Sequence, residues 1–296
     1  MALSSPTMKQ TSSRRDFLKA SLFGAAGVAL YSGEVERHWI DVSHRDVPLR
    51  GLSAGFDGMR VAQLSDIHLD HFTEPFFLRR VIERINQEKP DAVFLTGDFV
   101  TCEGAPGPGV HEAAWQCAGI LKELACKSIY AVLGNHDLTA GAAEVESALR
   151  GNGIEVLRNS YLPIERGGGR VWLAGLDDPV MGRPDIDITV PESIRNVRNE
   201  PVVLLCHAPD YAVRVQSHRA GQAVDLMLSG HTHGGQIRLP LIGALVLPTM
   251  GEKFDQGWFQ LGRMGLYVNR GIGTIGVPFR FDCPPEITIF TLRASA

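Results

Sequence analysis

The sequence lacks several features that mark common functional classes. Its five cysteines, at positions 102, 117, 126, 206 and 283, include no C-x-x-C pair and cannot all form disulfides. We expect most of them to be buried thiols. No G-x-x-x-x-G-K-[ST] loop is present, which argues against a nucleotide kinase or an ATPase. The apolar run from Ala20 to Leu30 is shorter than the ~20 residues that a membrane-spanning helix needs.

Strong charge of either sign is also absent. The net charge is −4 at pH 7, and because the first 31 residues carry +3, the remainder carries −7. An acidic body argues against nucleic-acid binding through bulk charge, and we expect no nucleic-acid partner. With 296 residues, 44% of them hydrophobic, the chain can bury a full core in one sizeable domain.

The N-terminal segment has the pattern of an export signal. Residues 13–19 (S-R-R-D-F-L-K) precede the apolar run, an order that resembles a bacterial twin-arginine signal. The alternative is an arginine pair before an ordinary amphipathic helix. No clear A-x-A cleavage site follows, so both a cleaved signal and an uncleaved anchor stay open.

This pattern leads to three expectations about organisation and location. Residues 1–45 are expected to form the leader, and residues 46–296 the folded domain. The twin-arginine (Tat) export machinery is an expected partner. The expected location is the periplasm, the cell envelope or the outer side of the cytoplasmic membrane.

Three apolar strands in the first half of the domain are each followed by a helical pattern. The strands are predicted at Arg60–Leu64, Ala92–Leu95 and Ile129–Leu133, and the helices at residues from Pro75, His111 and Ala142 onward. Consecutive β-α units need right-handed crossovers and give a parallel sheet that is buried on both faces.

After residue 150 the pattern changes to strands joined by shorter connections. Two strands flanking Gly167, Gly168 and Gly169 predict a hairpin. Further strands are predicted at Val202–Leu205, Leu226–Leu228, Gln236–Leu239, Leu266–Asn269 and Ile287–Leu292. We therefore expect an α/β fold, a four-layer αββα sandwich of two mixed sheets that pack face to face between helices.

Five of the predicted strands end in residues that can bind metal ions. These residues are Asp66 and His68, Asp98, Asn135 and His136, His207, and His231 and His233. Functional groups of open α/β sheets collect beyond the carboxyl ends of the strands. The i, i+2 spacing of the first and last pairs would direct both side chains to one side of an extended segment. A single residue of this kind at a strand end is more often a turn former or a helix cap, but such residues at five strand ends together favour a metal site.

The same clusters resemble the motifs of the calcineurin-like metallophosphoesterases. The family pattern is D-x-H, G-D, G-N-H-[DE], a single His, and G-H-x-H. This sequence has, in that order, Asp66-Ile67-His68, Gly97-Asp98, Gly134-Asn135-His136-Asp137, His207, and Gly230-His231-Thr232-His233. The match extends over roughly residues 59–292. The leader, Gly234-Gly235-Gln236 and the ending from Asn269 to Glu286 are similar to a bacterial exported or membrane-associated phosphodiesterase branch.

The resemblance implies an enzyme with two divalent metal ions. Asp66, His68 and His233 would hold one ion, Asn135, His207 and His231 the other, and Asp98 would bridge them. The nitrogen and oxygen donors, without thiolate, suit Mn, Fe, Ni or Zn. His136 would be catalytic, protonating the leaving group or steadying the transition state, and Asp137 would orient its ring. A hydroxide shared by the ions would attack phosphorus without a covalent phosphoenzyme.

Other residues carry weaker hypotheses. Arg270, Arg280 and Lys253 either bind substrate phosphate or serve as soluble surface charge. Asp70 and His71 are expected to be solvent-facing loop residues. The apolar segment from Leu239 to Pro248 predicts a buried strand, and its alternative is an exposed lip that contacts a bilayer or an acyl chain.

The sequence favours a phosphodiesterase that acts on a phospholipid or another envelope substrate. A broad-specificity phosphomonoesterase or nucleotide hydrolase is the alternative with the same chemistry. A non-catalytic scaffold is the third hypothesis, although a scaffold has no reason to keep the ligands and His136. The expected partners are a phosphoester substrate, with lipids among the candidates, and a peripheral membrane contact.

Overall fold

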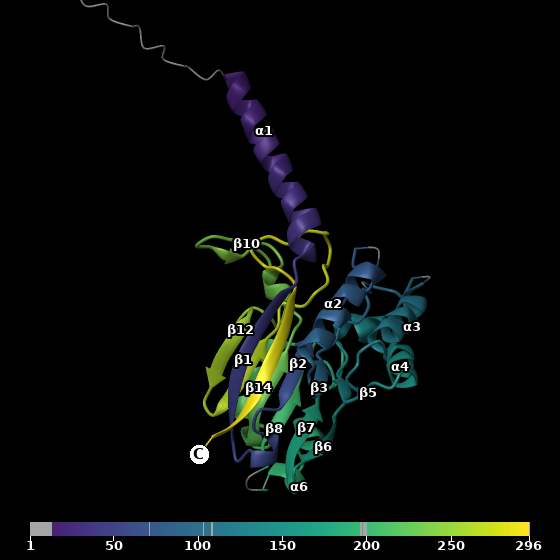
Figure 1. The fold of residues 1–296 in the computed structure, drawn as a ribbon, viewed down its shortest axis with the longest axis vertical. Helices are drawn as coiled ribbons and strands as arrows, with labels where there is room; N and C mark the ends of the chain where they lie inside the picture. Colours follow the sequence, from purple (N-terminus) through teal and green to yellow (C-terminus); the bar gives the residue numbers. More distant parts are fainter. Residues whose placement is uncertain are drawn as a thin grey trace, which may run out of the picture.

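Two six-stranded sheets form the centre of the part of the chain that the computed structural model describes (Figure 1). The described residues are 14–70, 72–102, 104–107, 109–195, 197 and 200–295. Residues 1–13 of the expected leader, and His71, lie outside them.

The first sheet has the strand order β1-β14-β2-β3-β4-β5. Strands β2 to β5 are parallel, whereas β14 is antiparallel to β2 and parallel to β1. The bounds are β1 Asp41–Arg50, β2 Arg60–Leu64, β3 Ala92–Leu95, β4 Ile129–Ala131, β5 Glu155–Val156 and β14 Glu286–Ser295. The β-α units of the first half therefore form the predicted parallel arrangement.

The second sheet has the strand order β12-β13-β9-β8-β7-β6. Its central strands are parallel, and the two edge strands, β12 and β6, are antiparallel to their neighbours. The bounds are β6 Ser160–Arg166, β7 Gly169–Gly175, β8 Val202–Leu205, β9 Val224–Ser229, β12 Gly257–Leu261 and β13 Met264–Val268. A separate small hairpin consists of β10 Arg238–Leu239 and β11 Gly243–Ala244.

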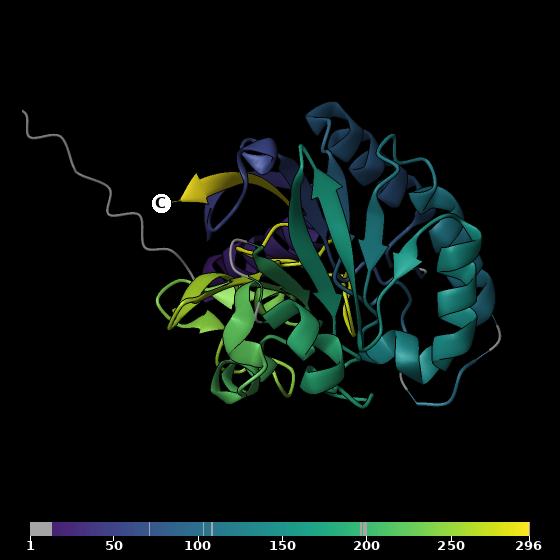
Figure 2. The ribbon, with the colours of Figure 1, turned by 90° about the horizontal axis from the view of Figure 1, so that it is seen from below.

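Helices cover the outer face of each sheet, as Figure 2 shows. Helices α2 Pro75–Glu88, α3 Val110–Leu121 and α4 Asn135–Gly151 pack on the first sheet, and α5 Ile186–Thr189, α6 Glu192–Arg195 and α7 Ala212–Ser217 on the second. The side chains of β3 alternate accordingly: Val93 and Leu95 face the helices, and Ala92 and Phe94 face the other sheet. The four-layer αββα prediction is confirmed.

Several local predictions differ from the structure. Strand β1 is mainly polar, contains Pro48 and lies at a sheet edge, so its sequence gives little strand signal. The expected boundary between residues 45 and 46 falls inside this strand. Helix α4 begins at Asn135 rather than near Ala142, and Gly141 with φ 116° kinks it. The thiol prediction is confirmed, because all five cysteines are free and all except Cys126 are buried.

The apolar segment from Leu239 to Pro248 is not a buried strand. It contains the small hairpin, and its large side chains Leu241, Ile242, Leu245 and Val246 are exposed. The buried-strand prediction was wrong because an apolar run has the same sequence signal in a core and in an exposed patch.

Helix α1 (Arg14–Leu30) stands away from the body and is exposed along its whole length (Figure 1). Its base is bound to the domain: Ser32 O accepts a hydrogen bond from Arg280 N at 3.1 Å, and the Glu36 carboxylate accepts one from Cys283 N at 2.7 Å. Among the described helices, none is both long and apolar enough for a membrane crossing.

Arg280 is completely buried and binds backbone rather than substrate. Its guanidinium donates to the carbonyl oxygens of Arg270, Gly271, Gly273 and Cys283. Both hypotheses for this residue, phosphate binding and surface charge, are wrong. The buried guanidinium is thus hydrogen-bonded, and its bonds hold the loop of residues 270–283 in place.

Replacing Arg280→Met should lower the free energy of unfolding by about 3 kcal/mol, because several buried carbonyl groups would lose their donor. Urea unfolding followed by circular dichroism measures this change. Arg293→Met is the control: Arg293 pairs with Asp46 at the surface, where an ion pair is worth less than about 1 kcal/mol. Equal stability of the two variants would contradict the structural role of Arg280.

Candidate metal centre

Five loops at one end of the two sheets bring the candidate ligands together. Asp66 and His68 follow β2, Asp98 follows β3, Asn135 begins α4 after β4, His207 follows β8, and His231 and His233 follow β9. The two i, i+2 pairs are not extended, contrary to the sequence interpretation. Asp66, His68, Asp98, His231 and His233 all have φ between 47° and 72°, the left-handed region that non-glycine residues rarely adopt. Backbone strain of this kind is typical of functional sites.

The glycine of the G-N-H-D block is required by close packing. A Cβ at Gly134 would overlap the Asp98 carboxylate. The same carboxylate accepts a hydrogen bond from His136 N at 2.9 Å. Two metal-binding loops can thus lie against each other only because one of them has no side chain at this position.

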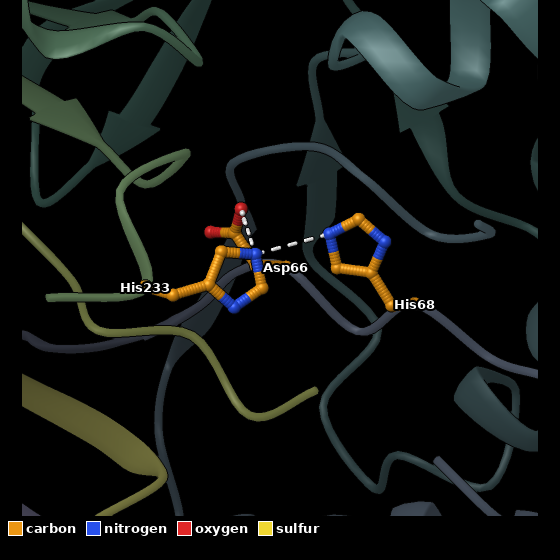
Figure 3. Close-up of side chains that lie close together, drawn as sticks. All are labelled: Asp66, His68 and His233. Atoms are coloured by element: carbon orange, nitrogen blue, oxygen red, sulfur yellow. Dashed lines mark hydrogen bonds and ion pairs between the residues drawn. The ribbon is translucent and has the colours of Figure 1, made fainter. Parts of the chain in front are cut away.

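The first group of ligands is Asp66, His68 and His233 (Figure 3). His68 Nε2 and His233 Nε2 are 3.1 Å apart, and Asp66 Oδ1 is 3.5 Å from His233 Nε2. The Asp66 carboxylate also accepts a hydrogen bond from His231 N at 2.9 Å. The three donor atoms belong to the loops that follow β2 and β9, one strand in each sheet, and they converge on one point.

The second group is Asp98, His207 and His231. His207 Nε2 lies 3.2 Å from His231 Nδ1 and 3.1 Å from Asp98 Oδ2. The same Asp98 oxygen is 3.5 Å from His68 Nε2, which belongs to the first group. Asp98 therefore lies between the two groups and is 2% exposed.

The outer ring nitrogens of the four histidines are all engaged. His207 Nδ1 donates to Thr96 O at 2.7 Å, His231 Nε2 to Thr249 O at 2.9 Å, and His233 Nδ1 to Gly273 O at 3.3 Å. His68 Nδ1 faces Thr101 Oγ1 at 3.3 Å, and the hydroxyl of Thr101 donates to Asp70. These acceptors place a proton on each outer nitrogen, so the inner nitrogen of each ring presents a lone pair when the ring is neutral.

This donor set fits divalent metal ions. Lone pairs that face one another at about 3 Å repel unless a cation lies between them. Asn135 Oδ1 is buried and has no hydrogen-bond partner among the described residues, as expected of an amide oxygen that binds a metal ion. The nitrogen and carboxylate donors would hold such ions without thiolate.

The electrostatics of the two groups differ. Burial lowers the pKa of His68 to about 3 and that of His233 well below its ordinary value. Burial alone would also lower the pKa of His207, but the Asp98 carboxylate outweighs burial and raises it well above the ordinary value. The pocket around Asp98 thus stabilises positive charge, whether that of a proton or of a metal ion.

Comparisons with known proteins agree with this geometry. Residues 59–235 match the calcineurin-like phosphoesterase family model. The chain belongs to this family. It is 34% identical to the uncharacterized metallophosphoesterase YkuE of Bacillus subtilis, with 96% of this chain and 98% of YkuE covered. It is 30% identical to the phosphodiesterase YaeI of Escherichia coli, with 95% and 99% covered.

Solved structures give a more distant likeness. A dimetal phosphatase from Danio rerio is 12% identical, with 76% of this chain and 94% of that chain covered and a TM-score of 0.46. Family membership makes the chain a metallophosphoesterase, a hydrolase of phosphoric esters, and the clustered histidines and aspartates are its candidate ligands for divalent metal ions.

In this phosphoesterase the Asp137 carboxylate does not orient the His136 ring, contrary to the sequence interpretation. The Asp137 carboxylate accepts hydrogen bonds from Gly134 N, Asp98 N and Phe99 N at 2.8 to 2.9 Å. Burial and the nearby Asp98 raise the pKa of Asp137 to about 8, and its backbone donors oppose that shift. Asp137 therefore joins two ligand loops. The His136 ring is instead oriented by Cys102 N, which donates to Nδ1 at 3.1 Å.

The remaining sequence hypotheses have mixed outcomes. Arg270 pairs with Glu286 at 3.1 Å and with Asp41 at 2.6 Å, so its charge is already compensated. Lys253 is exposed. Asp70 is not a free loop residue, because it fixes Thr101 and through it the His68 ring. The carbonyl partners of the other histidines carried no sequence signal, since every residue has a carbonyl group.

One further motif proves unrelated to the site. Residues 51–55 (G-L-S-A-G) match the G-x-S-x-G pattern of serine hydrolases. Ser53 follows β1 and precedes a short 3₁₀ turn, Ala54–Phe56, that approaches the backbone of Arg166 and Gly167 at the β6–β7 turn. Its hydroxyl has no hydrogen-bond partner among the described residues, so no base activates it.

Asp98→Asn should remove metal from both groups of ligands, because one Asp98 oxygen adjoins histidines of both. Metal content of the purified protein, measured by inductively coupled plasma mass spectrometry, tests this. Asp187→Asn, at an exposed carboxylate, is the control. Circular dichroism establishes that the variant is folded. Retention of the wild-type metal content by folded Asp98→Asn would rule out the shared position of Asp98.

Proposed function

We propose that this enzyme holds two divalent metal ions and hydrolyses phosphodiester bonds. The observation that carries the proposal is the position of the Asp98 carboxylate. One of its oxygens, Oδ2, lies within 3.5 Å of histidine nitrogens from both groups. Two such ions supply Lewis acidity and an activated water at neutral pH. We assign Asp66, His68 and His233 to one ion, and Asn135, His207 and His231 to the other.

His136 supports the same reaction from the side of the leaving group. Cys102 N donates to its Nδ1, so a neutral His136 ring carries its proton on Nε2. The ring lies edge-on to His68, with centroids 4.8 Å apart, and lines the cavity above the ligands. A donor in that position protonates the departing alkoxide or stabilises charge on phosphoryl oxygen.

The cavity favours a diester over a monoester. Its floor is formed by ligand residues and its walls by Ile237, Leu245, Val246, Ile275 and Val277. No lysine or arginine is among the described residues that line it. A monoester dianion gains more from such side chains than a diester monoanion does, so their absence weighs against the phosphomonoesterase alternative. The name of the similar Escherichia coli phosphodiesterase supports the same choice.

We further propose an envelope substrate, with a phospholipid as the leading candidate, and export through the twin-arginine route. The arginine pair and the exposed, mainly apolar α1 support this location. Because that route carries folded proteins, the metal site would be filled before the enzyme meets competing ions outside the cytoplasm.

His136→Ala should keep its metal content but lower the turnover of bis-p-nitrophenyl phosphate by ~10²-fold or more, because the leaving group loses its proton donor. Steady-state rates and metal analysis of the same preparation test this. His44→Ala, at an exposed side chain that pairs with Glu88 at the end of α2, is the matched control and should keep the wild-type rate. Preferential turnover of p-nitrophenyl phosphate by the wild-type enzyme would contradict the diesterase proposal.

Arg14→Lys with Arg15→Lys should retain the protein in the cytoplasm, because twin-arginine signals depend on the arginine pair. Fractionation of cells that express the full chain, followed by immunoblotting, measures this. The control is Lys19→Arg, which preserves both the pair and the charge. Export of the Lys-Lys variant at the wild-type level would exclude this route.

A further inference from the structure

An apolar hairpin projects beside the metal centre. We define the apolar hairpin as residues 238–248, which include β10 and β11. Leu241 and Ile242 at its tip are 108% and 70% exposed, and Leu245 and Val246 on its return segment are also exposed. Adjacent exposed side chains of this size mark a binding surface more often than isolated ones do.

The turn at the tip carries an apolar residue where its backbone favours glycine. Ile242 N donates to Leu239 O at 3.1 Å, which closes a four-residue turn with Pro240 at its second position. Leu241 occupies the third position with φ 69°. This is the arrangement of a type II turn, whose third position is usually glycine or asparagine. The turn geometry therefore does not explain why a leucine occupies this position, which points to a role for its exposed side chain.

The apolar hairpin is held firmly against the metal-binding loop. Arg238 at its base donates to Gly234 O at 2.6 Å and pairs with Asp255 at 2.8 Å. Ala244 of β11 packs on Gly235, two residues after His233, where any Cβ would overlap it. Movement of the tip relative to the ligands is thus restricted.

One wall of the catalytic cavity belongs to the apolar hairpin. The cavity has a volume of about 430 Å³ and is lined at its floor by Asp98, Asn135 and His136. Leu245 and Val246 form part of its wall, as do Ile275 and Val277. The return segment of the apolar hairpin therefore supplies apolar side chains both to the exposed surface and to the cavity that contains the metal ligands. A substrate that suits both ends has a phosphate group and a hydrocarbon chain.

Helix α1 emerges next to the apolar hairpin (Figure 1). Segment 280–283 connects them: Arg238 N donates to Phe281 O at 2.8 Å on one side, and Ser32 and Glu36 below α1 bind Arg280 and Cys283 on the other. The exposed apolar side chains of α1 include Phe17, Leu22, Phe23 and Leu30. Two apolar elements thus share one end of the molecule, and the cavity adjoins one of them.

We propose that α1 and the apolar hairpin form one bilayer-docking surface, and that the cavity receives a lipid phosphodiester directly from that bilayer. This proposal rests on the function proposed above. In the reaction water adds to phosphorus, one phosphorus–oxygen ester bond breaks, and the leaving alcohol takes the proton. The acyl chain lies along the wall of Leu245 and Val246 while the phosphate lies over the metal ligands.

A lipid surface is the occupant that the chemistry favours. Arg14, Arg15 and Lys19 outweigh Asp16 and give the outer part of α1 a net positive charge that matches anionic lipid phosphates. The tip of the apolar hairpin exposes two adjacent hydrocarbon side chains, Leu241 and Ile242, as insertion among acyl chains requires. A second copy of the chain is the competing occupant.

The test compares two activities and one binding measurement on the full chain. Leu241→Gly with Ile242→Ser removes the apolar tip while giving the left-handed position the residue it favours, so the fold should be kept. The rate at which phosphatidylglycerol and phosphatidylethanolamine in vesicles are hydrolysed should fall about tenfold or more. The rate of hydrolysis of soluble bis-p-nitrophenyl phosphate should stay unchanged. Flotation of the protein with the same vesicles, which needs no catalysis, should fall in parallel.

Ile188→Ser is the matched control. Ile188 is an exposed apolar side chain on α5, shortly before α6, which lies at the opposite end of the molecule from α1 (Figure 1). This variant should behave as the wild type in all three assays. Leu22→Ser with Phe23→Ser tests the α1 half of the surface and should weaken flotation.

The outcomes separate this proposal from the function on which it rests. If the soluble diester is hydrolysed but the hairpin variant acts on vesicles like the wild type, docking is disproved and the diesterase stands. If neither diester is hydrolysed but flotation depends on the hairpin, the surface stands and the catalytic proposal fails. Light scattering that shows a dimer dissociated by the hairpin substitutions, with flotation unchanged, identifies a second copy as the occupant and overturns the proposal.

Discussion

The mutual repulsion of buried lone pairs is the constraint on which this structure depends. Carbonyl or hydroxyl groups outside the centre orient the four ligand histidines so that the inner nitrogens, which carry lone pairs when the rings are neutral, meet in pairs about 3 Å apart. Such a set is stable only around positive charge. Left-handed backbone at five of the ligands, and a glycine against Asp98, are local costs of this convergence. The two sheets supply the rigid frame that maintains it.

Much of the fold could be predicted because buried parallel strands have a strong sequence signal. Strands β2, β3 and β8 are short apolar runs that end in polar residues, and the structure has them at the predicted residues. Edge strand β1 could not be predicted, since it is mainly polar and buries only Val47 and Leu49, so its place depends largely on pairing with β14. The buried-strand prediction for the apolar hairpin failed for the opposite reason, because its apolar side chains lie on the surface rather than in the core.

The candidate ligands could be identified because D-x-H, G-D and G-H-x-H spacings reflect what metal binding needs. Their supporting interactions could not be identified in this way. Asp137 appears in sequence next to His136 but binds the amides of the Asp98 loop, and Arg280 appears as a free cation but binds carbonyl groups. Arg280 and His233 even share the carbonyl of Gly273, so a distant arginine helps to orient a ligand. Such relations depend on backbone atoms, which every residue has.

The pairing of β1 with β14 has a consequence for biosynthesis. These strands are separated by more than two hundred residues, and all the other described strands lie between them in the sequence. The ribosome therefore makes β1 before the other strands and β14 after them, so the first sheet cannot be completed until residues 286–295 have been made. A polypeptide that stops early leaves β1 and β2 with unpaired edges, which chaperones and proteases can distinguish from the finished product.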